Sequence, residues 1–470
     1  MDDAVEEPGI NTFVQLPAYM REANRGLFEP RVLSIGPYHR DKQSTRDMEA
    51  HKEHILQGFL QRPGNANHAY YVQEVTARCF AQARRCYVGN VDGYTVEMLT
   101  RDGCFIVELL LRWSEGTAHA DNYVWLMWNS VYYDLLLFDN QIPFFVLDRI
   151  FRVFVAHNAN QACFNNNVQL LHLVRIFFNH RGQFSWANLN DLNLPNASQV
   201  RHLLDLQYKL VISNNLGIEA ARRNGCLCRL FCCNIVCHRP SMPRGIGRKF
   251  YAAVPHHASR IPGANELQDY GVGFRAKRLN ERVKLFDVTF RGKTMNIPRF
   301  EINFGSKILL ANLFAYDQQI ACQPAAAGNA AVVDQLPGNN GEQGRNNNNV
   351  GVVTSYVVLM NALVNSRDDV VVLQEEGVLD NMLSNEEEVA SFFNNLGRCV
   401  LVDVTEHRYS RMFQDVNRYW RNGVFRKYCS IFCMRHCKTP LTCLSLLAAI
   451  LLLIFSCTSM IFAILKYTRD

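Results

Sequence analysis

The sequence lacks the motifs that usually assign a chemistry to a chain. It has no phosphate-binding G-x-x-x-x-G-K-[ST] loop, no G-x-G-x-x-G segment after a strand, no G-x-S-x-G elbow and no kinase signature. It shows no internal repeat, and its amino terminus, MDDAVEEPGINTF, lacks the basic and apolar regions of a secretory signal. These absences predict that the chain is not an enzyme and has no catalytic or cofactor-binding residues.

Cysteine is sparse, and neither sign of charge dominates. Sixteen cysteines in 470 residues are too few for a disulfide scaffold of this length. The 49 basic and 43 acidic residues leave a net charge of +6, which does not indicate nucleic-acid binding. Hydrophobic residues make up 48% and charged residues 20%, which excludes a wholly disordered, collagen-like or coiled-coil chain.

The longest apolar stretch is at the end of the chain. Residues 441–465 carry no charge, and as a helix they would be about 37 Å long, more than the hydrocarbon core of a bilayer. They predict a single-pass transmembrane helix that binds membrane lipid and precedes a short tail, 466–470. Basic residues are more numerous before this stretch than after it, which predicts that the bulk of the chain is cytosolic.

Three cysteines come just before this stretch. Cys429, Cys433 and Cys437 are spaced four residues apart and would share one face of a helix. Juxtamembrane cysteines are candidates for palmitoylation, although they can also be ordinary small residues of a helix.

The body of the chain predicts a mainly α fold. After an acidic tail at 1–9, residues 10–438 predict one large helical domain. Apolar residues at helical spacing predict a helix over 94–112, and 135–151 predicts a helix, a turn and a second helix, with Asp139 or Asn140 as the cap of the second. Alternating residues over 285–298 predict a small β-hairpin that turns at 291–293.

Two segments interrupt this pattern. Residues 220–265 contain no acidic residue and predict a basic loop, which either meets an anionic lipid or acidic partner or is simply solvated. Residues 323–349 are rich in Asn, Gly and Ala and predict a flexible insertion.

One cluster has the chemistry of a metal site. Thiols and an imidazole gather over thirteen positions of the basic loop and would suit a soft metal or a redox sensor. Their spacing fits no standard zinc pattern, however, and they can also be free thiols. Its members are Cys226, Cys228, Cys232, Cys233, Cys237 and His238. Asp134 and Asp139 would diverge by about 140° on a helix, which predicts ion-pair or capping roles rather than a catalytic pair.

Six blocks occur in order along the chain. They are 30–39 (PRVLSIGPYH), 96–110 (with VEML and DGCFIVELL), 134–147 (DLLLFDNQIPFFVL), 261–267 (IPGANEL) with Gly271-Val272, 387–394 (EEVASFFN) and the apolar stretch 441–465. Together they resemble the plant DUF247 family, also called UPF0481, over about residues 10–465.

The resemblance implies a plant-specific, membrane-associated protein without an established activity or cofactor. It offers no catalytic residue, and it implies structural roles for Gly36-Pro37 as a turn, Asn140 as a cap and Gly103 as a close-packing position. The best-known role in the family is pollen-side recognition in grass self-incompatibility.

The sequence therefore predicts a non-enzymatic, membrane-anchored recognition or interaction protein, acting in cell–cell recognition such as pollen self-incompatibility. Two alternatives stay open. A deep pocket that gathers Asp, His or Cys side chains would favour an enzyme of unknown chemistry, and metal bound at Cys226 to His238 would favour a metal or redox sensor.

Overall fold

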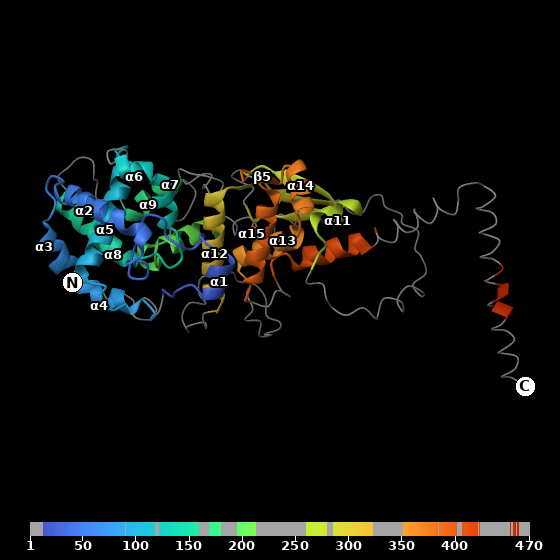
Figure 1. Cartoon of the computed structure of the whole chain (residues 1–470), viewed down its shortest axis with the longest axis horizontal. Helices are drawn as coiled ribbons and strands as arrows, with labels where there is room; N and C mark the ends of the chain where they lie inside the picture. The colour runs from blue at the N-terminus through green and yellow to red at the C-terminus, as the bar shows by residue number, and fades with distance from the viewer. Residues whose placement is uncertain are drawn as a thin grey trace, which may run out of the picture.

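The computed structural model places the amino-terminal helices on one side of the molecule and the carboxy-terminal helices and strands on the other (Figure 1). Helix α1, Ala18–Ala23, and helix α12, Phe304–Cys322, lie side by side where the two parts meet. The side chain of Asn312 in α12 donates a hydrogen bond to the backbone oxygen of Leu27, at 2.9 Å. The described residues are 13–89, 91–117, 122–158, 169–179, 195–212, 260–279, 285–322, 351–383, 385–401, 407–421, 423 and five positions between 452 and 459.

Helix α5, Val96–Ser114, is the centre of the amino-terminal part. It packs against α2, Arg46–Leu60, α8, Phe144–His157, and α9, Leu170–Asn179. A methyl group at Gly103 would lie 2.5 Å from Cδ1 of Ile150 in α8, so only glycine lets the two helices approach this closely. The predictions of a helix over 94–112 and of close packing at Gly103 are both confirmed.

Shorter helices surround this centre. They are α3, His68–Tyr70, a π-helical turn at Tyr71–Thr76, α4, Ala77–Arg85, α6, Asn122–Leu126, α7, Trp128–Asp134, and a helix at 203–212, with 3-10 turns at Gln43–Thr45 and Ala197–Gln199.

The carboxy-terminal part combines helices with two small sheets. Strand β3, Thr294–Pro298, pairs in parallel with β1, Gly273–Lys277, and antiparallel with β2, Thr289–Arg291. Strands β4, Phe300–Ile302, and β5, Leu379–Asn381, form a parallel pair. The other elements are α11, Ala264–Asp269, α13, Val352–Leu363, α14, Arg367–Glu375, α15, Glu386–Arg398, and a helix at 410–421.

The predicted β-hairpin is confirmed. Strands β2 and β3 form it, with Phe290 opposite Met295. Gly292 at the turn has φ +65°, a left-handed conformation that favours glycine.

The predicted cap of the second helix in the 135–151 segment is wrong. Helix α7 ends at Asp134, and α8 begins at Phe144 after Pro143, without a capping side chain. The residues between them form a buried turn, so Asp139 and Asn140 are too far from the first turn of α8 to cap it. Both side chains instead bind the amino-terminal segment, as described below.

The fold-class prediction needs a further correction, because the transmembrane helix is not supported. Across the parts of the chain that the structure describes, no helix is both long enough and apolar enough to cross a membrane. The 19-residue helices α5 and α12 are core helices whose buried aspartates, Asp102 and Asp317, bind other parts of the protein. Most of residues 441–465 lie outside the described residues, and lipid binding through them has no support in the rest.

Several sequence predictions fall on residues that the structure does not describe. These are the acidic tail 1–9, nearly all of the basic loop 220–265, the insertion 323–349 and the tail 466–470. They stay predictions, as does the cytosolic orientation of the bulk.

Candidate functional site

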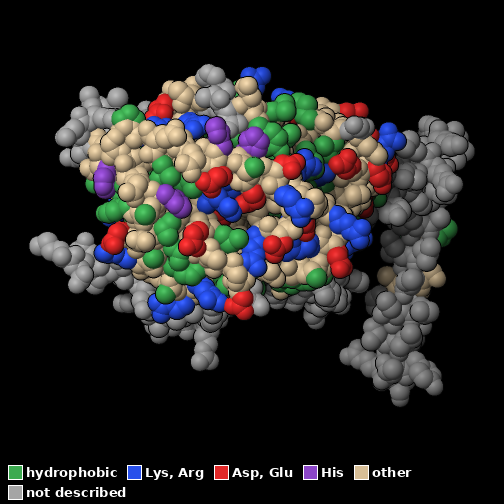
Figure 2. Space-filling model, turned by 60° about the vertical axis from the view of Figure 1, so that its left-hand side comes forward, with side chains coloured by type: hydrophobic (Ala, Val, Ile, Leu, Met, Phe, Trp, Pro, Cys, Tyr) green, Lys and Arg blue, Asp and Glu red, His purple; other side chains and the backbone are tan. Residues whose placement is uncertain are grey.

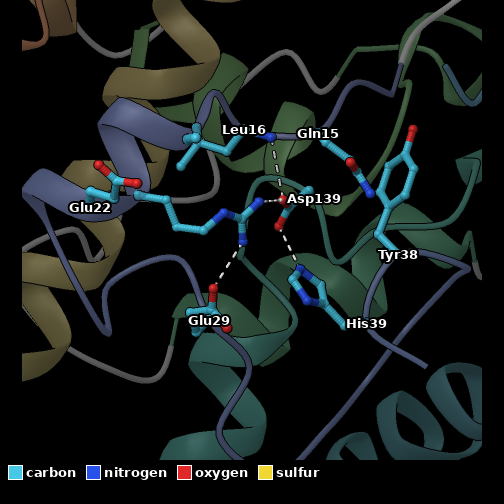
Figure 3. Close-up of a pocket in the computed structure, with 9 residues that line it drawn as sticks. Gln15, Leu16, Glu22, Glu29, Tyr38, His39 and Asp139 are labelled. Atoms are coloured by element: carbon cyan, nitrogen blue, oxygen red, sulfur yellow. Dashed lines mark hydrogen bonds and ion pairs between the residues drawn. The ribbon is translucent and has the colours of Figure 1, made fainter. Parts of the chain in front are cut away.

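A pocket of about 560 Å³ opens where the amino-terminal segment meets the turn between α7 and α8 (Figure 3). Eight of its lining residues belong to the segment from Gln15 to His39, which includes α1, and one comes from the turn. They are Gln15, Leu16, Ala18, Arg21, Glu22, Glu29, Tyr38, His39 and Asp139.

Buried polar side chains at the end of α7 and in the turn after it hold the amino-terminal segment in place. The carboxylate of Asp134 accepts hydrogen bonds from the backbone N–H groups of Arg31, Val32 and Leu33, at 2.9 to 3.1 Å. The side chain of Asn140 accepts from the N–H of Ile35 at 2.7 Å and donates to the backbone oxygen of Leu33. The sequence blocks 30–39 and 134–147 are thus one structural unit, since the second satisfies the backbone of the first.

A close turn at Gly36 completes this unit. Gly36 has φ +73°, and a Cβ atom there would lie 2.6 Å from the backbone oxygen of Gln141. The prediction of a turn at Gly36-Pro37 is confirmed.

Asp139 is the centre of the pocket's polar network. Its side chain is 1% exposed and accepts hydrogen bonds from Nη2 of Arg21 at 2.7 Å, Nε2 of His39 at 2.8 Å and the backbone N–H of Leu16 at 3.4 Å. Burial by itself raises the pKa of Asp139, but the hydrogen bonds and charges of His39 and Arg21 outweigh it and lower that pKa below its ordinary value. Asp139 is therefore a carboxylate that its neighbours stabilise in the charged form.

The network continues from Arg21 to Glu29 and Lys42. Nη1 of Arg21 donates to Oε1 of Glu29 at 3.0 Å, and Nζ of Lys42 binds the other oxygen of Glu29. Burial disfavours the charged forms of Arg21 and Glu29, but the hydrogen bonds and opposite charges of their partners outweigh burial. The pKa of Arg21 is therefore raised and the pKa of Glu29 is lowered. Two cations and two anions therefore balance one another at the base of the pocket.

Tyr38 lines the pocket with its ring, while its hydroxyl group is engaged elsewhere. The oxygen lies 2.9 Å from the backbone oxygens of Phe13 and Val88 and accepts a hydrogen bond from the N–H of Val88 at 3.1 Å. Burial, together with the charge of Asp139, raises the pKa of Tyr38 to about 12. The hydroxyl is therefore neutral, and it fastens the start of the segment to the chain after α4.

The arrangement allows two kinds of chemistry. An imidazole oriented by a buried carboxylate can move a proton, and Nδ1 of His39 has no hydrogen-bond partner among the described residues. The nine lining residues include no Ser, Thr or Cys, so the lining offers this histidine no aliphatic hydroxyl or thiol to activate. Gln15 and Glu22 are exposed at the mouth of the pocket, where their side chains are available to hydrogen-bond a ligand or partner.

The structure brings together only some of the residues that the sequence singled out. The predicted ion-pair role is confirmed for Asp139, which binds Arg21, whereas Asp134 forms neither a cap nor an ion pair that the structure shows and instead binds backbone N–H groups of a non-helical segment. The metal candidates Cys226, Cys228, Cys232, Cys233, Cys237 and His238 and the lipidation candidates Cys429, Cys433 and Cys437 lie outside the described residues. Within the described parts of the chain, no three His, Cys, Asp or Glu side chains are grouped to hold a metal ion.

Sequence reasoning missed Arg21, Glu29 and His39 as site residues. His39 closes the block 30–39, and this position was the available signal for it. Arg21 and Glu29 stand in no motif, and only the fold brings them to Asp139.

The fold and the site define a helical protein whose amino-terminal segment is fastened by buried ion pairs beside a polar pocket. Sequence comparison gives the family: residues 13–455 match DUF247, described as a plant protein of unknown function, and the chain belongs to this family. The family resemblance of the six sequence blocks is thereby confirmed.

Two proteins of Arabidopsis thaliana are similar to this chain. UPF0481 protein At3g47200 is 23% identical over 477 residues, which cover 97% of this chain and 87% of that protein. Putative UPF0481 protein At3g02645 is 24% identical over 162 residues, or 34% of this chain and 25% of that protein. No solved structure matches the chain.

Proposed function

We propose that this chain is a non-enzymatic interaction protein that recognises a partner through the surface around the Asp139 pocket. The observation that carries this proposal is that the buried polar groups of the pocket are already hydrogen-bonded, whereas two exposed ones are not. Every carboxylate oxygen of Asp139 and Glu29 accepts a hydrogen bond from another group of the chain. Gln15 and Glu22, in contrast, are exposed at the mouth of the pocket and have no partner among the described residues. The buried groups therefore fix the shape of the pocket, and the exposed groups at its rim are available to a partner.

The main alternative is an enzyme, and the pocket does gather an aspartate and a histidine. A general acid or base works best when its pKa lies near the operating pH. The pKa of Asp139 is lowered by His39 and Arg21, and the pKa of Tyr38 is raised to about 12, so both move away from neutrality. These directions make Asp139 and Tyr38 unsuited to exchange a proton near neutral pH, and the lining offers His39 no Ser, Thr or Cys to activate, so recognition is the function that we propose.

The surface supports a protein-like partner. On the face drawn in Figure 2, acidic and basic side chains intermingle with hydrophobic ones instead of separating into fields of one sign. A mixed surface complements another mixed surface, whereas a polyanion such as a nucleic acid favours a continuous basic patch.

The process we propose is cell–cell recognition in plants, of which pollen self-incompatibility is one case. The resemblance of the sequence blocks to the family supports this choice. The other alternative, a metal or redox sensor, depends on Cys226 to His238, which lie outside the described residues.

Proximity labelling in the native tissue tests the proposal. The variant Gln15→Ala/Glu22→Ala removes the two unpartnered groups of the rim, and Gln268→Ala/Glu375→Ala makes the same chemical changes at exposed sites of α11 and α14. We expect a defined set of neighbours to be lost with the first variant and kept with the second. Equal labelling by both variants would refute recognition through this surface.

A second variant separates recognition from catalysis. In His39→Gln the amide can still donate to Asp139, but it cannot serve as a base. A recognition protein should keep its neighbours and its biological effect with this change. Loss of the biological effect with unchanged neighbours would favour the enzyme.

A further inference from the structure

The pocket contains two classes of polar group, and the first class is already satisfied. Both carboxylate oxygens of Asp139 and of Glu29 are engaged by other residues of the chain. The hydroxyl of Tyr38 is held by the backbone at Phe13 and Val88. These groups shape the pocket and leave little for a ligand.

The second class is free to bind. The amide of Gln15 and the carboxylate of Glu22 are exposed and have no partner among the described residues. Arg21 uses Nη1 and Nη2 for one bond each, so three of its five N–H groups are unspent. These groups line the same pocket, and Figure 3 shows Gln15 and Glu22 on opposite sides of Asp139.

Charge argues against a strongly ionic ligand. A cation in the pocket would find only the carboxylate of Glu22 unpaired among the described residues and would meet the guanidinium of Arg21, which binds both Asp139 and Glu29. An anion would meet three carboxylates, those of Glu22, Glu29 and Asp139. A ligand without charge avoids both repulsions and can still use every free donor and acceptor.

Hydroxyl groups are the natural partners of such a set, because each donates one hydrogen bond and accepts others. A volume of about 560 Å³ is within the range of small-molecule sites, roughly 300–1,000 Å³. The ring of Tyr38 and the side chains of Leu16 and Ala18 add apolar wall on which the C–H face of a sugar ring can pack.

We propose that this pocket binds a neutral polyhydroxylated ligand, a mono- or disaccharide, through Gln15, Glu22 and Arg21. The inference rests on the proposed function, because it names the chemistry that the pocket recognises on a partner. Glu22 and Gln15 set the selectivity, since they are the groups that the protein itself leaves unbound.

Saturation-transfer difference NMR on the full chain tests the inference. The probes are glucose, galactose, N-acetylglucosamine and maltose, with arginine and acetate as charged ligands. We expect ring protons of at least one sugar to receive saturation. In Gln15→Ala/Glu22→Ala the affinity should fall by at least about tenfold, because one lost hydrogen bond is to a charged group. In Gln268→Ala/Glu375→Ala it should stay within about twofold, because these residues lie in the other part of the molecule.

Three results would overturn the inference: no transfer from any of the four sugars, equal affinity in the two double variants, or binding of arginine or acetate in place of the sugars. The two proposals fail separately. Partner labelling that needs Gln15 and Glu22, without sugar binding, refutes the saccharide site and leaves the proposed function standing. Sugar binding with unaltered labelling refutes the proposed function and supports the site.

Discussion

Arg21 and Asp139 are 118 positions apart in the sequence and are joined by a hydrogen-bonded ion pair of 2.7 Å. The carboxylate is buried and the guanidinium is about one-quarter exposed. The pair connects α1, at the junction of the two parts of the molecule, to the turn between α7 and α8. Its partners His39 and Leu16 make the same connection, so the segment is attached at several points around one carboxylate.

The first prediction concerns this ion pair. Arg21→Ala leaves the buried charge of Asp139 with only His39 and one backbone N–H, and breaking a buried pair in this way should lower the free energy of unfolding by about 3 kcal/mol. Urea denaturation measures the loss. Arg418→Ala, which breaks the exposed pair with Asp415, is the control and should cost less than about 1 kcal/mol. Similar costs for both variants would show that the Asp139 network does not stabilise the fold.

The second prediction concerns the contact between α5 and α8. Gly103→Ala places a methyl group 2.5 Å from Cδ1 of Ile150 and should destabilise the protein by about 1–3 kcal/mol through overpacking. Ile150→Val removes that Cδ1 atom and should recover part of the loss in the double variant. Strict additivity of the two single changes in thermal or urea unfolding would contradict this contact.

The third prediction is a loss of stability in acid caused by two buried histidines. Burial lowers the pKa of His202 to about 3 and that of His407 to about 4, so the folded protein keeps both neutral while the unfolded chain protonates them below about pH 6.5. Stability is therefore complete above that pH and falls as the pH decreases. Between pH 8 and pH 5 each histidine should lower the free energy of unfolding by about 2 kcal/mol.

Asparagine variants isolate this effect. The side-chain oxygen of asparagine can replace Nδ1 as the acceptor of the bonds from the N–H groups of Asp205 and Tyr409. His202→Asn/His407→Asn should flatten the decline between pH 8 and pH 5, whatever its effect on stability at neutral pH. His54→Asn, at an exposed position of α2, is the control and should keep the full decline. An unchanged slope in the double variant would assign acid sensitivity to other groups.

The fourth prediction concerns the hairpin turn. Gly292 has φ +65° and no neighbouring atom within 4 Å of an added Cβ, so a substitution there meets backbone strain without a steric clash. Gly292→Val should cost about 1–2 kcal/mol, whereas Gly292→Asn should cost less because asparagine tolerates the left-handed region. Equal unfolding midpoints for the two variants would argue against this turn conformation.

Local pattern predicted the elements that depend on local chemistry. The spacing of Leu99, Gly103, Ile106 and Leu110 predicted α5, because helical periodicity is written into neighbouring residues. Alternation at Phe286, Val288 and Phe290 with a glycine turn predicted the β2–β3 hairpin for the same reason. The sequence blocks also marked 30–39 and 134–147 as special, although not that they contact each other.

The roles of Asp139 and Asn140 show where local reasoning ends. Beside a proline and an apolar run, they resemble helix caps, and capping is a local interaction. In the folded protein most of their partners come about a hundred positions earlier, among them Arg21, His39, Leu33 and Ile35, and Asn140 adds one local bond to the backbone oxygen of Asp134. A polar side chain binds whichever donors the packed core brings to it once water is excluded, and local sequence does not encode that choice.

The sequence by itself determined the helical class, the hairpin, the close-packing glycine and the membership of the family, because these follow from periodicity, backbone freedom and blocks of residues that stand next to one another. Only the tertiary structure decided the pocket. Its lining residues come from α1, from the two ends of the amino-terminal segment and from the turn before α8. Burying the apolar faces of these elements places Arg21, His39 and Asp139 within hydrogen-bonding distance, and the exclusion of water makes each of them the partner that the others need.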